Sequence, residues 1–60
     1  MKIGDRFTYQ TEDEGLLHCE VTSTDEDGSV YFTSDEGVAS YLTKQELDEN
    51  AEFITMVEES

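Results

Sequence analysis

Short runs of aromatic, β-branched and other apolar residues recur along this chain, and polar or acidic residues bound each run. Within the runs, apolar and polar positions alternate with a period of two, which is typical of a strand with one buried face. In the second run, Leu17, Cys19 and Val21 fall on one face, opposite the polar His18 and Glu20. The pattern predicts four strands, over residues 6–10, 16–23, 29–33 and 38–42.

Acidic segments that contain glycine separate these runs, and we interpret them as tight turns. They cover residues 11–15, 24–28 and 34–37. The strongest turn signal is Asp27-Gly28, because two-residue hairpin turns place both central residues at positive φ and favour this dipeptide. Connections this short predict that neighbouring strands pair antiparallel, as a meander.

The hydrophobic period changes after residue 42. Thr43 and Glu46 have the spacing of a capping box, in which Thr43 is the N-cap, and Asn50 is a helix-stop signal. These residues predict a short helical turn over residues 44–49. Residues 52–57 alternate once more and predict a closing strand. The predicted fold class is mainly β, with five antiparallel strands and a helical turn before the last strand.

Three segments of this order resemble SH3-like small β-barrels of the Tudor and KOW type. They are Ile-Gly-Asp-Arg-Phe at 3–7, Asp-Gly-Ser-Val-Tyr-Phe at 27–32 and Tyr-Leu-Thr-Lys-Gln-Glu-Leu at 41–47. The resemblance implies a five-stranded antiparallel barrel. It also implies binding of peptides, methylated side chains or nucleic acids rather than catalysis. This chain departs from the nucleic-acid-binding members, because the loops that are basic in those proteins are acidic here.

Sixty residues are enough for one domain with a thin core. We expect that domain to cover residues 1–57 and the acidic C-terminus, residues 58–60, to be frayed. Cys19 is the only cysteine, so no intramolecular disulfide can form. The chain contains no signal-peptide pattern and no apolar run long enough to span a membrane. A cytoplasmic location is the expectation from these features.

The net charge is the most unusual feature of the composition. Sixteen acidic residues oppose three basic ones, and the formal net charge is −13. Proteins bind nucleic acids largely by neutralising phosphates with Lys and Arg, so direct nucleic-acid binding is not expected. Anionic membrane surfaces are disfavoured for the same reason. Long-range steering favours a cationic partner instead.

The sequence offers few candidate residues for metal binding or catalysis. With Gly28 at the sixth position of a calcium loop, the twelfth position is Ser34 rather than the required Glu, so no EF-hand is predicted. His18 and Cys19 are adjacent on a strand and point to opposite faces, so they cannot act as base and nucleophile. The carboxylates lie in predicted turns rather than in a dry cleft. We expect no enzyme activity, no cofactor and no metal site.

Two binding hypotheses remain open. In the first, the chain is an acidic protein that docks on a basic surface of a partner. One form of this function is nucleic-acid mimicry that inhibits or modulates a nucleic-acid-binding protein, by analogy with small phage-type inhibitors. In the second, it is an SH3-like adaptor module that binds a peptide through exposed tyrosines, with Tyr9 as a further contributor. We expect a monomer or a weak homo-oligomer. The candidate partner-binding residues are Glu12, Asp13, Glu14, Asp25, Glu26, Asp27, Asp35, Glu36, Tyr31 and Tyr41.

Overall fold

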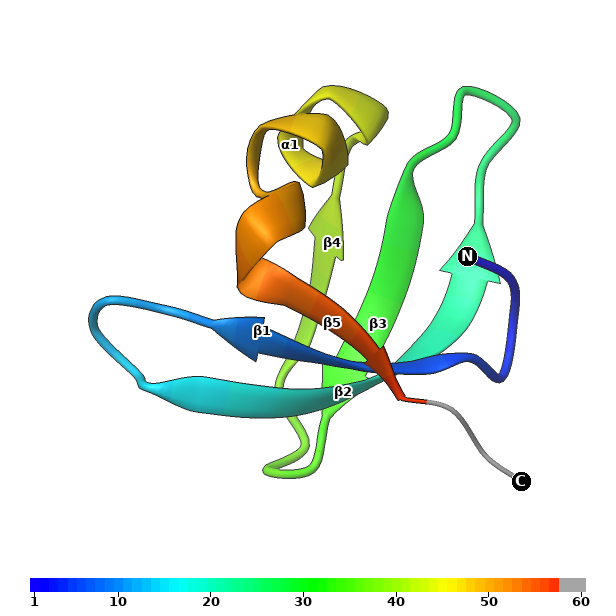
Figure 1. Ribbon diagram of the computed structural model, residues 1–60. Coiled ribbons are helices and arrows are strands. Elements are labelled where there is room, and N and C mark those ends of the chain that lie inside the picture. The colour runs from blue at the N-terminus through cyan, green and yellow to red at the C-terminus, as the bar shows by residue number, and fades with distance from the viewer. Residues whose placement is uncertain (58–60) are drawn as a thin grey trace.

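The computed structural model is a five-stranded, fully antiparallel sheet, and it confirms the predicted mainly β fold (Figure 1). The structure describes residues 1–57, and the C-terminus predicted to be frayed lies outside them. No helix in the described part is long and apolar enough to cross a membrane. The elements are β1 Arg6–Gln10, β2 Leu16–Thr24, β3 Val30–Ser34, β4 Ala39–Leu42, α1 Lys44–Glu49, the 3-10 turn η1 Ala51–Phe53 and β5 Ile54–Val57.

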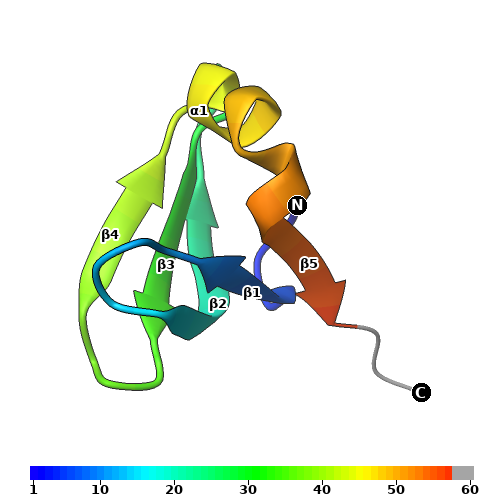
Figure 2. The same ribbon diagram turned by 60° about the vertical axis from the view of Figure 1, so that its left-hand side comes forward.

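The sheet has the strand order β4-β3-β2-β1-β5 and is strongly bent. The first half of β2 pairs with β1 and its second half pairs with β3, with a β-bulge between Val21 and Ser23. Bulges bend a strand and increase its twist, and β1 and β5 accordingly cross the direction of β3 and β4 (Figure 1). The edge strands β4 and β5 stand on opposite sides of the fold (Figure 2). Because these two strands do not pair, the sheet is not closed, and the predicted barrel is not confirmed.

The core lies on the inner face of the bent sheet. Six side chains are buried there: Phe7, Cys19, Val21, Val30, Phe32 and Leu42. The rings of Phe7 and Phe32 meet edge to face, with centroids 5.2 Å apart. Such aromatic pairs add to the stabilisation that burial provides. Cys19 and Val21 are buried and Leu17 packs against the core, which confirms that these three residues share the inner face of β2.

The Asp27-Gly28 turn differs from the prediction. Gly28 has a φ of 94°, but no residue other than glycine has a positive φ in residues 1–57. The Gly28 N–H donates to the Asp25 carbonyl at 3.1 Å, and the Asp25 N–H donates to the Ser29 carbonyl at 2.9 Å. This pattern is a three-residue turn closed by a glycine bulge, in which only the glycine needs positive φ. The β3–β4 turn repeats these bonds around Ser34 and Gly37.

The helix has the predicted bounds and the predicted cap. The Thr43 hydroxyl accepts the Glu46 N–H at 3.1 Å, and the Glu46 carboxylate accepts the Thr43 N–H at 3.3 Å. Asn50 is the C-cap, as expected. The closing strand, however, was predicted too long. The Phe53 N–H donates to the Asn50 carbonyl at 2.9 Å, so residues 51–53 form η1 and β5 begins at Ile54.

Candidate binding surface

The predicted acidic residues lie on three turns that point in different directions (Figure 1). The β1–β2 and β3–β4 turns contribute carboxylates to the rim of one cleft, described below. The β2–β3 turn stands apart, at the other end of β3. The structure therefore divides the predicted acidic residues among three separate places instead of joining them in one patch. The β1–β2 turn carries Glu12, Asp13 and Glu14, the β2–β3 turn carries Asp25, Glu26 and Asp27, and the β3–β4 turn carries Asp35 and Glu36.

Almost none of this negative charge is neutralised within the fold. Among residues 1–57 there is one salt bridge, between the Arg6 guanidinium and the Asp35 carboxylate at 3.4 Å. Both side chains are exposed, and an exposed pair of this kind contributes little to stability. No other carboxylate in these residues forms a salt bridge, and all of the other acidic residues except the half-buried Asp5 are exposed.

Hydrogen bonds hold the β2–β3 turn in a defined shape. The Asp27 carboxylate accepts the Ser29 N–H at 3.0 Å, and this backbone hydrogen bond lowers the pKa of Asp27. Asp27 therefore stays ionised to lower pH than an ordinary aspartate does. The turn presents its negative charge at a fixed place.

The two candidate tyrosines form a pair on the outer face of the sheet. Tyr31 and Tyr41 are cross-strand partners, their ring centroids are 5.8 Å apart, and both are exposed, as predicted from their strand phase. The Tyr31 hydroxyl donates to the Asp25 carboxylate at 2.7 Å. This hydrogen bond, and the negative charge of Asp25, raise the pKa of Tyr31. The structure thus brings together three of the predicted binding residues.

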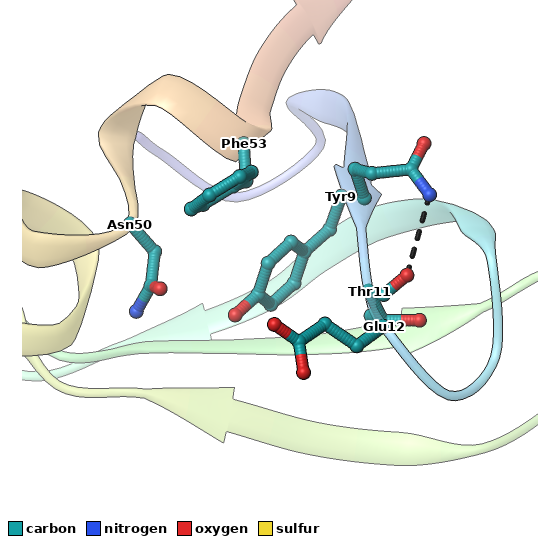
Figure 3. Close-up of a pocket in the computed structure, with 6 residues that line it drawn as sticks. Tyr9, Thr11, Glu12, Asn50 and Phe53 are labelled. Carbon is teal, nitrogen blue, oxygen red and sulfur yellow. Dashed lines mark hydrogen bonds between the residues drawn. The ribbon is translucent and has the colours of Figure 1, made fainter.

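A cleft of about 290 Å³ lies beside Tyr9, and we call it the Tyr9 cleft. Figure 3 shows the Tyr9 ring between Phe53 and Asn50 on one side and the Glu12 carboxylate on the other. The side-chain amide of Gln10, which also lines the cleft, donates to the Thr11 carbonyl at 3.3 Å. Phe53 reaches this position only because η1 replaces the first residues of the predicted closing strand.

A second cleft, of about 260 Å³, adjoins the first, because Tyr9 and Thr11 line both; we call it the Leu17 cleft. Its lining combines apolar side chains with two carboxylates from different turns. Sequence reasoning missed both clefts, because neither turn alone shows what its side chains will meet. The residues that line the Leu17 cleft are Tyr9, Thr11, Glu14, Leu17, Phe32, Ser34, Glu36, Val38, Ser40 and Leu42.

The side chains of His18 and Cys19 lie on opposite faces of β2, so they cannot act together as base and nucleophile. Cys19 is buried in the core, whereas His18 is exposed. Burial raises the pKa of the Cys19 thiol, and the nearby charge of Asp35 raises it further. A thiol with a raised pKa is a poor nucleophile at neutral pH. No group of three His, Cys, Asp or Glu side chains that could hold a metal ion occurs within residues 1–57.

Comparison with known protein families, curated proteins and solved structures found no match. The resemblance to SH3-like barrels therefore remains a prediction.

Proposed function

We propose that this protein is a non-catalytic binding domain that docks on a basic surface of another protein. The observation that carries the proposal is a net charge of −13 with one ion pair within residues 1–57. Fields of one sign attract oppositely charged partners and raise the rate of encounter. Where the partner's basic surface normally holds DNA or RNA, docking would compete with the nucleic acid, so mimicry is one form of this function.

The small number of basic side chains supports binding to a basic protein surface rather than to nucleic acid itself. Arg6 pairs with Asp35, which leaves Lys2 and Lys44 as the other basic residues. A Cβ placed on Gly28 would lie 3.1 Å from the Lys44 side chain, so the stem of Lys44 packs against the β2–β3 turn. No basic cluster forms in the described residues that could neutralise several phosphates, which nucleic-acid binding requires.

Affinity capture with the intact protein tests the proposal, provided that the salt dependence of the purified partner is then measured. We expect a partner with a basic surface whose dissociation constant rises at least tenfold between about 0.1 M and about 1 M NaCl, since salt screens exposed charges. A partner with an affinity that does not change over this range would overturn the proposal.

Two variants with equal net charge separate the turns from the general charge of the protein. The turn variant, E12Q/E26Q/E36Q, removes one carboxylate from each acidic turn. The control variant, E20Q/D48N/E52Q, removes three exposed carboxylates from elsewhere. We expect the turn variant to bind more weakly than the control variant. Equal weakening by both would show that the turns have no special role in docking.

The Tyr31–Tyr41 pair favours a second candidate function, recognition of a peptide through aromatic contacts. Exposed aromatic side chains are frequent anchors at interfaces. In that case Tyr31→Ala or Tyr41→Ala should abolish binding while the fold is retained, and the turn variant should bind normally. Tyr31→Phe serves as the matched control, because it keeps the ring and removes only the hydrogen bond to Asp25. Loss of binding in the turn variant alone would exclude this second function.

A further inference from the structure

The Leu17 cleft has an apolar floor that reaches the core. Phe32 and Leu42 belong to the buried core, and Leu17 packs against it. At the margin of the cleft, Val38 is 60% exposed. The volume of the cleft, about 260 Å³, is below the roughly 300–1,000 Å³ of typical small-molecule pockets. A space of this size and polarity suits one inserted side chain better than a whole cofactor.

The rim of the same cleft is acidic. Glu14 comes from the β1–β2 turn and Glu36 from the β3–β4 turn, and both side chains are exposed. Neither forms a salt bridge with another of the described residues, 1–57. The inserted group therefore meets apolar contacts below and two negative charges at the entrance.

We propose that the Leu17 cleft binds one large apolar side chain of a partner protein whose neighbouring residues are Lys or Arg. This inference rests on the proposed function and names the part of the basic surface that is recognised. The apolar side chain contacts Leu17 and Val38, and the flanking cations pair with Glu14 and Glu36.

The charge of the chain argues against other occupants. A second copy would bring another net charge of −13 to the same rim. A fatty acid or an anionic lipid would place its own negative group near Glu14 and Glu36. A segment with basic residues on both sides of an apolar one satisfies the floor and the rim together.

Two synthetic peptides test the proposal on the intact protein. One is Lys-Lys-Leu-Lys-Lys and the other is Lys-Lys-Ser-Lys-Lys, so the pair has equal charge. Burial of a leucine side chain predicts that the first peptide binds about tenfold more tightly or better. In amide NMR spectra it should shift the signals of Leu17, Phe32 and Val38. Equal binding of both peptides, or shifts away from these residues, would overturn the proposal.

Variants assign the two parts of the cleft separately. Ser40 is the cross-strand partner of Phe32 and lines the cleft, so Ser40→Phe should fill it and remove the preference for the leucine peptide. E14Q/E36Q should weaken that peptide more than the control E20Q/E52Q, which removes the same charge from exposed positions outside both clefts and outside the acidic turns. Equal effects of the two double variants would overturn the rim assignment.

The outcomes also distinguish this inference from the proposed function. If both peptides bind equally and salt weakens both, docking on basic partners stands and the Leu17 cleft is not the site. If the leucine peptide binds the cleft but salt has no effect on it, the charge-based function fails and so does the cationic part of the inference.

Discussion

Raising the salt concentration should stabilise this protein. Its negative charges are concentrated in a fold with extents of 29 × 26 × 23 Å and one internal ion pair in residues 1–57, so they repel one another. Unfolding moves the charges apart and relieves that repulsion. Added NaCl shortens the range of the repulsion, which removes part of the drive to unfold.

The size of the effect follows from the dimensions of the fold. We treat the native state as a charged sphere of about 13 Å radius, which is half the mean extent of the fold. We treat the unfolded chain as a sphere with the radius of gyration expected for its length, about 23 Å. With a net charge of −13, screened Coulomb energies in water then differ between the two states by about 7 kcal/mol at 0.1 M salt and about 3 kcal/mol at 1 M. The free energy of unfolding should therefore rise by about 4 kcal/mol over this range.

Urea unfolding followed by circular dichroism measures this change, because urea is uncharged and leaves the ionic strength under control. The turn variant, E12Q/E26Q/E36Q, is the internal control. The repulsion scales with the square of the net charge, so its salt-induced gain should be about 2 kcal/mol rather than about 4. A free energy of unfolding that stays constant or falls with NaCl would show that charge repulsion does not destabilise the native state. An equal gain in the variant would assign the effect to something other than charge.

Three further predictions concern the turns and the helix. Gly28→Ala and Gly37→Ala each force alanine to positive φ and should lower the free energy of unfolding by about 1–2 kcal/mol. Gly28→Ala should cost more, because its Cβ would meet the Lys44 side chain at 3.1 Å, and equal losses would contradict that packing. Thr43→Ala should lower the free energy of unfolding in urea by about 1 kcal/mol. Thr43→Ser should lower it much less, because only serine retains the hydroxyl that caps the helix. Asp25→Ala removes both the acceptor and the charge, and it should lower the raised pKa of Tyr31 toward that of ordinary tyrosine in an ultraviolet titration. The stability from this bond is present below the ordinary tyrosine pKa and is lost as pH rises through the raised value. An unchanged pKa of Tyr31 in the variant would exclude the bond.

The strands and the helix could be predicted because each depends on local pattern. Apolar alternation placed Leu17, Cys19 and Val21 toward the interior, and the structure buries Cys19 and Val21 with Leu17 packed against them. The capping-box spacing of Thr43 and Glu46 fixed the start of α1. These signals need no knowledge of the rest of the chain.

Two local features were missed for a physical reason. The Asp27-Gly28 pair fits both a two-residue turn and a three-residue turn with a glycine bulge, and only the hydrogen bonds of Asp25 separate them. Phe53 fits a strand by its period, but its N–H bonds to the Asn50 carbonyl three residues earlier. Because 3-10 turns are frequent at the ends of α-helices, the position of residues 51–53 directly after α1 was the available hint.

The candidate site was the least predictable part. The exposure of Tyr31 and Tyr41 followed from strand phase. The hydrogen bond from Tyr31 to Asp25 depends instead on how the β2–β3 turn folds back. The Leu17 cleft depends on the bend of the sheet, which brings the β1–β2 turn near the β3–β4 turn. Residues 14 and 36 are distant in sequence, and no motif marks their proximity.

Docking through the acidic turns is tested most directly by the association rate constant with the captured partner. This rate constant is measured as a function of NaCl concentration for the native protein, the turn variant and the control variant. Docking through the acidic turns predicts a rate constant that falls steeply with salt in the native protein and the control variant. The turn variant should associate more slowly at low salt and show a shallower dependence. A rate constant that does not change with salt in the native protein would contradict the account.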